Sequence, residues 1–321
     1  MTALRAGIDL GGTKIQVVVL DESNEVKGQC RVPTPRDNGP QGVIDAMIDA
    51  VKAAIADAAL SETKLVGVGI GGPGQIDPVA GTLSGAPNLP DWLGIVQVVE
   101  PMQKSLGTKT VLANDVQVAV IAEDQLGAGR NYSSVLGVFC GTGVGGGIII
   151  NGKLWKGRGA AGEIGHMVVE PNGAMCGCGR RGCMEAYAGR ASMERKARKM
   201  VDDGAKTSLF KIMKEKEKTN LSSSVWDKAL RHNDKVAEQL MDRAVWALGF
   251  GVASAINLLD PECVVIGGGL GSRLGQPFVD AIIDAMQPHL LKVKTPPAIV
   301  LASLGDLGGA IGATLLLDGN N

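Results

Sequence analysis

Near its N-terminus the chain carries the stretch RAGIDLGGTKIQVVVL, residues 5–20. Residues 5–10 and 14–20 have the composition of strands, and the glycine turn between them is typical of a hairpin. Glycine at a strand end lets backbone N–H groups approach an anion with no Cβ in the way. The turn residues therefore predict a phosphate-binding hairpin: Asp9, Gly11, Gly12, Thr13 and Lys14.

After this hairpin, predicted strands and helices alternate along the chain. A third strand is expected near 25–32, an amphipathic helix over 41–60, a buried strand over 65–70, a short helix over 95–106 and a strand over 109–113. This alternation predicts a mainly parallel sheet with flanking helices.

A similar order restarts near residue 135. Strands at 135–139 and 147–150 flank a glycine turn, a long helix is expected over 235–258, and a strand at 263–266 runs into three glycines. The last apolar stretch, 307–317, predicts a helix rich in glycine and alanine that packs closely on its neighbours. Duplicated halves of this kind predict an α/β protein with an actin-like, ribonuclease H-like fold of two domains around a cleft. The expected domains are 1–114, completed by about 305–321, and 115–304.

Composition excludes several classes of function. The 321 residues are 45% hydrophobic and 20% charged, with a formal net charge of −1. This balance gives no broad electrostatic footprint for nucleic acid or an anionic membrane. No apolar run reaches the roughly 18–20 residues that cross a bilayer, and the N-terminus shows no signal-peptide core. We therefore expect a cytoplasmic protein whose partners are small molecules, with no nucleic acid or membrane among them.

Two more glycine clusters follow apolar strands, at 141–147 and 267–271. Neither has the Gly-Lys-Ser or Gly-Lys-Thr ending of a Walker A loop. Thr142, Gly143 and Gly268 are the candidate nucleotide-binding residues here, and glycines that only make tight turns are the alternative. Asp9, in the first turn, is a candidate Mg²⁺ ligand, since Mg²⁺ prefers carboxylates and waters.

A compact group of metal-ligand residues lies between 166 and 183. His166 precedes the run CGCGRRGC, which contains Cys176, Cys178 and Cys183. One imidazole and three thiolates are the four ligands of a closed tetrahedral zinc site, so a bound Zn²⁺ is expected to be structural. Three reduced cysteines in a turn are the alternative.

Acidic residues accompany these motifs. Asn114 and Asp115 end a strand and begin a helical stretch, where Asp115 is either the N-cap or a general base for a hydroxyl. Glu163 and Glu185 bracket the cysteine run and are candidate acceptors for the vicinal hydroxyls of a sugar. Solvated surface charges are the alternative for both.

Five motifs in order carry a family resemblance: DLGGT (9–13), GPGQID (72–77), ND (114–115), GEIGH (162–166), and the cysteine run that ends at Glu185. Together, over residues 6–317, they resemble the ROK family of repressors, uncharacterised reading frames and sugar kinases, especially its bacterial glucokinases. The resemblance implies an actin-like fold, usually in homodimers or homotetramers. The run after Glu185 lacks the serine that the family often has there.

The resemblance also implies roles for single residues. Asp115 matches the catalytic base of the family. It would take the proton of a sugar hydroxyl, with O6 as the first candidate, as that oxygen attacks the γ-phosphate of Mg²⁺-bound ATP. The residues that match sugar contacts are Gly72, Asn88, Asn114, Glu163, His166 and Glu185. His166 also matches a zinc ligand, and Thr13, Thr142 and Gly268 match nucleotide-binding turns.

Several alternatives stay open at this point. The substrate can be D-glucose or another sugar, such as N-acetylmannosamine, N-acetylglucosamine or fructose, and polyphosphate can replace ATP. A non-catalytic, sugar-sensing ROK protein would carry a helix-turn-helix domain before the first strand, where this chain has six residues before Gly7. An actin-fold ATPase with a protein partner would not explain the cysteine run.

Overall fold

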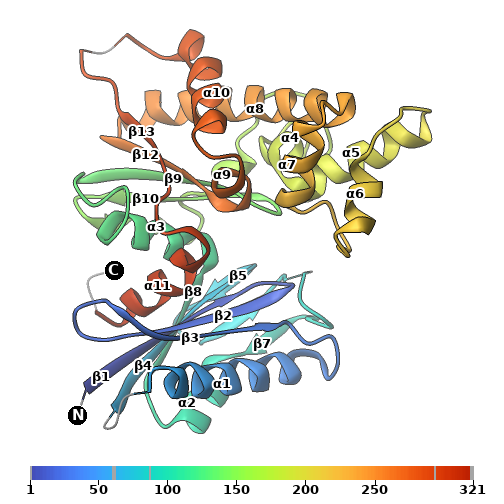
Figure 1. Ribbon diagram of the computed structural model, residues 1–321. Helices are drawn as coiled ribbons and strands as arrows, with labels where there is room; N and C mark the ends of the chain where they lie inside the picture. The colour runs from blue at the N-terminus through green and yellow to red at the C-terminus, as the bar shows by residue number, and fades with distance from the viewer. Residues whose placement is uncertain (1, 60–62, 87, 293, 319–321) are drawn as a thin grey trace. The chain divides into compact units, whose positions relative to one another are not determined.

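The computed structural model describes residues 2–59, 63–86, 88–292 and 294–318. The chain forms two compact units, one comprising Met1–Gly127 and Leu304–Asn321 and the other Ala128–Ser303 (Figure 1). The chain therefore leaves the first unit once and returns to it at its C-terminal end.

The first unit is built on a five-stranded sheet in the order β3-β2-β1-β4-β8. Its strands are β1 (Thr2–Leu10), β2 (Lys14–Leu20), β3 (Val26–Pro33), β4 (Thr63–Gly72) and β8 (Thr110–Asn114). β2 runs antiparallel to β1 and β3, whereas β4 runs parallel to β1 and β8. In this register Asp9 pairs with Gly71, and Gly72 pairs with Asn114. The carboxyl ends of β1, β4 and β8 therefore meet at one edge.

Helices cover both faces of this sheet, as Figure 1 shows. They are α1 (Gly39–Asp57), α2 (Val99–Leu106), α3 (Asp115–Gln125), α11 (Gly308–Leu315) and the 3-10 turns η3 (Gly305–Leu307) and η4 (Leu316–Asp318). One face of α1, including Val43, Met47 and Val51, is buried against the sheet. A second, three-stranded antiparallel sheet in the order β5-β6-β7 belongs to the same unit: β5 (Gln75–Asp77), β6 (Thr82–Ser84) and β7 (Ile95–Gln97).

Glycines let α11 pack directly against backbone. A Cβ on Gly69 of β4 would lie 1.7 Å from the carbonyl oxygen of Ala313, and a Cβ on Gly312 would lie 1.8 Å from that of Val118 in α3. Neither position can hold a larger residue without a backbone shift. The prediction of a closely packed glycine- and alanine-rich helix near 307–317 is confirmed.

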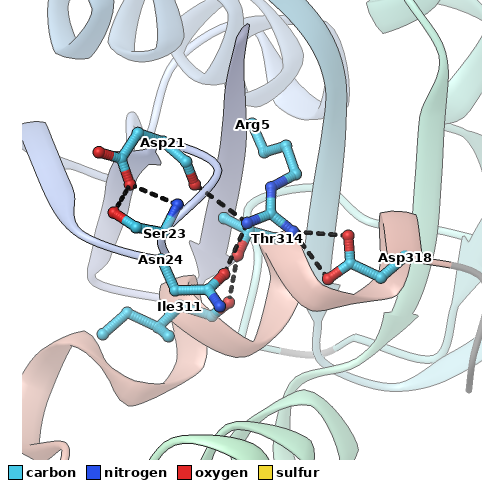
Figure 2. A network of polar contacts seen from close by, with 7 residues as sticks. All are labelled: Arg5, Asp21, Ser23, Asn24, Ile311, Thr314 and Asp318. Carbon is cyan, nitrogen blue, oxygen red and sulfur yellow. Dashed lines mark hydrogen bonds and ion pairs between the residues drawn. The ribbon is translucent and has the colours of Figure 1, made fainter.

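The C-terminal end of the described chain is tied to β1 by Arg5 (Figure 2). One guanidinium nitrogen of Arg5 donates to both carboxylate oxygens of Asp318, at 2.5 and 2.7 Å. The other donates to Asn24 Oδ1 at 2.6 Å and to the carbonyl oxygen of Asp21 at 3.1 Å. Arg5 thus joins β1, the β2–β3 turn and η4, which fixes α11 to the first unit at a second point.

The second unit repeats the sheet of the first. Its five strands have the order β11-β10-β9-β12-β13: β9 (Ser134–Cys140), β10 (Val144–Ile150), β11 (Lys153–Leu154), β12 (Cys263–Gly267) and β13 (Ala298–Leu301). β10 runs antiparallel to β9 and β11, and β12 runs parallel to β9 and β13. Two halves with the same strand order and directions form an actin-like fold, which confirms the predicted fold class.

Along the sequence, most helices of the second unit come between β11 and β12. They are η1 (Ile164–His166), α4 (Glu185–Ala188), α5 (Arg190–Asp202), α6 (Leu209–Glu215), α7 (Ser223–Arg231), α8 (Lys235–Leu259), α9 (Gly268–Leu274), α10 (Gln276–Met286) and η2 (Gln287–His289). α8 buries one broad face, and Trp226 of α7 is fully buried in the same core. This core supports β9, β12 and the segment 162–190.

Some element limits differ from the sequence predictions. Residues 95–97 form β7, so the predicted helix 95–106 is confirmed only from Val99 onward. β10 begins at Val144, so residues 145–147 lie in a strand and the second glycine turn is confined to 141–143. α3 belongs to the first compact unit, whereas the predicted domains place residue 115 in the second. Within the described residues, no helix is long and apolar enough to span a membrane.

The N-terminus of α8 yields a prediction about acid stability. The Asp234 carboxylate accepts hydrogen bonds from the backbone N–H groups of Ala237 and Ser208 and from the Thr207 hydroxyl. Burial raises the pKa of Asp234, but hydrogen bonds from Ser208, Ala237 and Thr207 outweigh it and lower the pKa below the ordinary value. The stabilisation is therefore complete above the unfolded-state pKa and is lost as the pH falls through the folded-state pKa.

We expect Asp234→Ala to cost about 1–2 kcal/mol at pH 7, typical of a lost N-cap. The gap in Tm between the variant and the wild type should narrow steadily below about pH 4. Asp49→Ala is the control, because that carboxylate is 79% exposed with only a loose contact to Lys52. A Tm gap that stays constant from pH 7 to pH 3 would contradict this account.

Candidate functional site

In the first unit, the turn between β1 and β2 has free backbone donors. The N–H of Gly11 donates to the carbonyl oxygen of Lys14 at 2.9 Å, and Thr34 Oγ1 donates to that of Gly11 at 2.6 Å. Within the described parts of the chain, the N–H groups of Gly12 and Thr13 have no hydrogen-bond partner. Two adjacent free amides at a glycine turn are suited to a phosphate group.

The same turn lies against Asn88, for which the family resemblance implies a sugar contact. A Cβ on Gly12 would lie 2.6 Å from the backbone oxygen of Asn88 and 2.7 Å from its Cβ. Only glycine allows this approach, so the structure brings these two predicted site residues together.

Asp9, at the end of β1, is the predicted Mg²⁺ ligand. Burial raises its pKa, the Lys14 charge lowers it, and the Asp306 charge raises it again. A Cβ on Gly309 would lie 3.0 Å from Asp9 Cγ, so the carboxylate faces the first turn of α11. A half-buried carboxylate with a second acid nearby is stabilised in its charged form by a bound cation, which fits the predicted Mg²⁺ role.

Asn114 and Asp115 lie where β8 passes into α3. Asn114 Oδ1 accepts from the N–H groups of Val116 and Gln117, at 3.0 and 3.2 Å. Asn114 is therefore the N-cap, and the alternative that gave Asp115 this role is wrong. Asp115 is the first helical residue, and its Oδ1 also accepts from Val116 at 2.9 Å.

The sheet register gathers the predicted residues of the first unit. Asp9, Gly72 and Asn114–Asp115 lie at the carboxyl ends of β1, β4 and β8, which are neighbours in the sheet. A Cβ on Gly71 would lie 3.4 Å from Asp115 Cα and 2.6 Å from a methyl group of Val118, so α3 begins in close contact with β4. The carboxyl ends of parallel strands are the usual place for ligands in open α/β sheets.

In the second unit, the turn between β9 and β10 repeats this chemistry. The N–H of Gly141 donates to the carbonyl oxygen of Gly143 at 2.8 Å. The N–H groups of Thr142 and Gly143 have no partner within the described ranges. Gly268, with φ 77°, follows β12. A Cβ added at this residue would lie 2.6 Å from the backbone nitrogen and the backbone oxygen of Cys140. The second and third glycine turns are therefore adjacent.

The four predicted metal ligands converge within the second unit. The ligand atoms of His166, Cys176, Cys178 and Cys183 all lie within 4.8 Å of one another. Cys178 Sγ and Cys183 Sγ are 3.7 Å apart, and Cys176 Sγ lies 3.8 Å from His166 Nδ1. A tetrahedral site with Zn–S near 2.3 Å and Zn–N near 2.0 Å has edges of about 3.6–3.8 Å. These two spacings fit a zinc ion.

The thiols differ in their acidity. Burial raises the pKa of Cys176 to about 12, whereas hydrogen bonds from the Arg180 backbone and side chain lower that of Cys178 to about 6. A bound dication favours the thiolate form of every ligand, so it would remove this difference.

Glu185 connects the cysteine run to the second glycine turn. Its Oε2 accepts from the N–H of Val144 at 3.0 Å, and its Oε1 lies 3.6 Å from Cys176 Sγ. A Cβ on Gly143 would lie 2.2 Å from Glu185 Oε2, so glycine is needed there for the carboxylate to reach the strand. The sequence predicted Gly143 and Glu185 as members of separate motifs, and the structure places them in contact.

Glu163 lies on the other side of His166. Its Oε2 is 3.9 Å from His166 Nε2, whereas Nδ1 of the same ring faces Cys176. The imidazole therefore presents one nitrogen to the candidate metal site and the other to a carboxylate. At 3.9 Å, Glu163 Oε2 and His166 Nε2 are too far apart for a direct hydrogen bond.

Sequence reasoning missed a group of side chains that support the cysteine run. The Tyr187 hydroxyl accepts from the N–H of Ala174 at 2.7 Å and donates to Glu170 Oε2. Arg243 of α8 pairs with Glu170 at 2.7 Å and lies over the Trp246 ring at 3.8 Å from its centroid. Tyr187 is one of only two tyrosines in the chain and lies two residues after Glu185, which is the one signal that the sequence offered.

The chain is similar to known proteins over nearly its whole length. The sequence model described as ROK family matches residues 5–320. The glucokinase of Thermotoga maritima is 34% identical over 316 residues, with 97% of this chain and 96% of that protein covered. The N-acetyl-D-glucosamine kinase of Escherichia fergusonii is 32% identical, with 97% and 98% covered. The solved ROK glucokinase of Streptomyces griseus, in complex with glucose and AMPPNP, has a TM-score of 0.81 and 32% identity, with 98% of each chain covered.

The contact between Gly143 and Glu185 can be tested with a double-mutant cycle. Gly143→Ala places a methyl group 2.2 Å from Glu185 Oε2 and should displace the carboxylate from the Val144 N–H, at a cost of about 1–3 kcal/mol. In a Glu185→Ala background the same substitution should cost much less, because the atom that it meets is gone. Unfolding followed by calorimetry measures both.

Gly141→Ala is the matched control, since its nearest neighbour would be 4.0 Å away. It should leave Tm nearly unchanged. Equal costs of Gly143→Ala with and without Glu185 would show that the carboxylate does not lie against this glycine.

Proposed function

We propose that this chain, which belongs to the ROK family and is a sugar kinase, transfers the γ-phosphoryl group of ATP to a hexose. The first candidate substrate is D-glucose, which would give glucose 6-phosphate. The observation that carries the proposal is the full-length similarity to glucokinases, together with Asp115 at the carboxyl end of β8. The metal-ligand cluster and the two turns with free amides support the same conclusion.

Asp115 is proposed as the general base. Its carboxylate accepts the proton of the sugar O6 hydroxyl while O6 forms a bond to the γ-phosphorus and the bond to the β,γ-bridging oxygen breaks, which releases ADP. Phosphoryl transfer needs mainly positioning and charge stabilisation, and a base of this kind contributes about 10²–10⁴ in rate. The position of Asp115 at the first residue of α3, packed against β4, holds it in a rigid frame.

The sugar is proposed to be held by Gly72, Asn88, Asn114, Glu163, His166 and Glu185. Oδ1 of the Asn114 side chain already accepts hydrogen bonds from two N–H groups of the helix, so only the side-chain NH₂ group is available to a sugar hydroxyl. With Nδ1 of His166 facing the cysteines, Nε2 is the atom that would face the sugar. Glu163 and Glu185 would accept hydrogen bonds from hydroxyls, as carboxylates do well.

ATP is proposed to bind at the three glycine turns: Gly11, Gly12, Thr13 and Lys14 in the first, Thr142 and Gly143 in the second, and Gly268 in the third. The free amides of the first two turns are donors for phosphate oxygens. Asp9 would hold Mg²⁺, directly or through water, and the ion would neutralise charge on the phosphates.

Zinc is proposed to have a structural role. His166, Cys176, Cys178 and Cys183 would fill its four positions and leave none for a reacting water. The ion would fix the loop that carries Glu185 at its end, so its contribution to catalysis is the position of that carboxylate.

N-Acetylglucosamine is the second candidate substrate, because a kinase for that sugar is 32% identical to this chain over nearly its whole length. An ADP-release assay with glucose, N-acetylglucosamine, N-acetylmannosamine and fructose separates the candidates. Glucose should give the highest kcat/KM. A higher value for an N-acetylhexosamine would replace glucose as the substrate without changing the reaction.

The role of Asp115 is tested with Asp115→Asn, which keeps the size of the side chain and removes its basicity. We expect kcat to fall by about 10²–10⁴, with glucose affinity within a few-fold of wild type. Asp49→Asn, an exposed position on α1, is the control and should turn over normally. Near-normal turnover of Asp115→Asn would remove it as the base.

Metal analysis tests the proposed zinc site. Protein purified without chelator should contain about one zinc ion per chain. Cys183→Ser should reduce the zinc content to background and lower Tm, because structural zinc contributes directly to folding stability. Cys30→Ser, which changes a half-buried thiol of β3, should retain the metal. Full zinc content in Cys183→Ser would contradict the ligand assignment.

A further inference from the structure

Arg190, the first residue of α5, lies against the second glycine turn. Its Nε donates to the carbonyl oxygen of Gly141 at 3.1 Å, and its Nη2 lies 3.5 Å from Thr142 Oγ1. The backbone N–H of Arg190 donates to the same Gly141 oxygen at 3.2 Å, and that of Ala191 donates to the Thr142 oxygen at 3.0 Å. The guanidinium is therefore held at the turn by both side chain and backbone.

The third glycine turn lies on another side of the same group. A Cβ on Gly269 would lie 3.9 Å from Arg190 Nη2 and 2.8 Å from Ser223 Oγ. The Ser223 hydroxyl occupies the near side of this space, and Arg190 Nη2 lies at its edge. Arg190 thus lies between two turns that are proposed to bind the nucleotide.

The charge of Arg190 has no carboxylate partner in the described parts of the chain. Glu194, whose charge favours the protonated guanidinium, is itself 2.5 Å from Arg198 Nη2 and accepts from the N–H of Leu221 at 2.8 Å. Burial lowers the pKa of Arg190, which means that its surroundings disfavour the positive charge. An anion at this place would reverse that penalty.

Donors without partners surround the same space. Arginine has five N–H donors, and the protein supplies acceptors to two of its nitrogens. The backbone N–H groups of Thr142 and Gly143 next to it have no partner in the described ranges. A phosphate group has the charge and the several acceptor oxygens that this arrangement lacks.

We propose that Arg190 is a nucleotide-binding residue that donates to a phosphate group of the nucleotide held at residues 141–143. The inference rests on the proposed function only in that a nucleotide binds at this turn; it does not depend on which sugar is phosphorylated. Asp115 acts on the sugar hydroxyl, whereas Arg190 contributes to affinity for the phosphate chain.

The test compares the affinities of ATP, ADP and adenosine, measured by calorimetry without sugar. Arg190→Gln should weaken ATP and ADP about 10–100-fold, the value of a hydrogen bond between charged groups, and leave adenosine within about twofold. Arg190→Lys, which keeps the charge but loses the planar fork, should lie between the two. Raising the salt concentration should weaken ATP binding more in wild type than in Arg190→Gln.

Arg198→Gln is the matched control. It removes the same charge from the same helix, at a side chain that is 51% exposed and pairs with Glu194. Its nucleotide affinities should equal those of wild type.

Three results would overturn the inference. Wild-type affinity for ATP in Arg190→Gln would show that the guanidinium does not contact phosphate. Equal losses for ATP and adenosine, with a lower Tm, would show that Arg190 only supports the turn. A wild-type protein that binds neither ATP nor ADP would remove the proposed donor as well, so failure of the proposed function is distinguishable from failure of the inference alone.

Discussion

In the second unit, the two oxygens of one carboxylate link the cysteine run to the second glycine turn. Glu185 accepts from the Val144 N–H with one oxygen and faces the Cys176 sulfur with the other. It therefore fixes the position of the cysteine run relative to the glycine turn at the start of β10. Gly143 is required for this contact, because any side chain there would occupy the place of Oε2. A metal ion held by the cysteines would bring positive charge close to this carboxylate and reduce the cost of burying it.

The first unit is organised by close contact between backbones. Gly69 and Gly312 let α11 approach both β4 and α3 at distances that no side chain would permit. The pairing of Arg5 with Asp318 then holds the end of the chain on β1. Because α11 carries Gly309 against Asp9, the return of the chain to the first unit also shapes the place of the proposed Mg²⁺ ligand. The C-terminal segment is therefore part of the candidate site.

Much of this could be predicted from sequence because the signals are local. The strand–glycine–strand pattern of residues 5–20 and its repeat after residue 135 correctly predicted two sheets of the same order. The GEIGH and CGCGRRGC segments predicted the four clustered ligands, since their spacing allows one short loop to surround an ion. Asp115 was placed correctly at a strand-to-helix junction, although the capping residue proved to be Asn114.

Other features depend on contacts between distant residues and have no local pattern. Residues 95–97 form a strand because β6 pairs with them, which the apolar spacing of that segment does not show. Arg190 occurs in a stretch rich in charge and becomes distinctive only through its contacts with Gly141 and Thr142, almost fifty residues earlier. The support that Tyr187 receives from Glu170 and Arg243 likewise joins three separate segments.

The central claim is that a metal-bound loop holds the carboxylate groups that bind the sugar. The most direct measurement is the dissociation constant of glucose for the zinc-loaded protein, for the same protein after chelation, and after zinc is restored, with circular dichroism to follow the fold. The account predicts that glucose affinity falls at least tenfold on chelation and returns on reloading. Unchanged glucose affinity in a folded, zinc-free protein would contradict it.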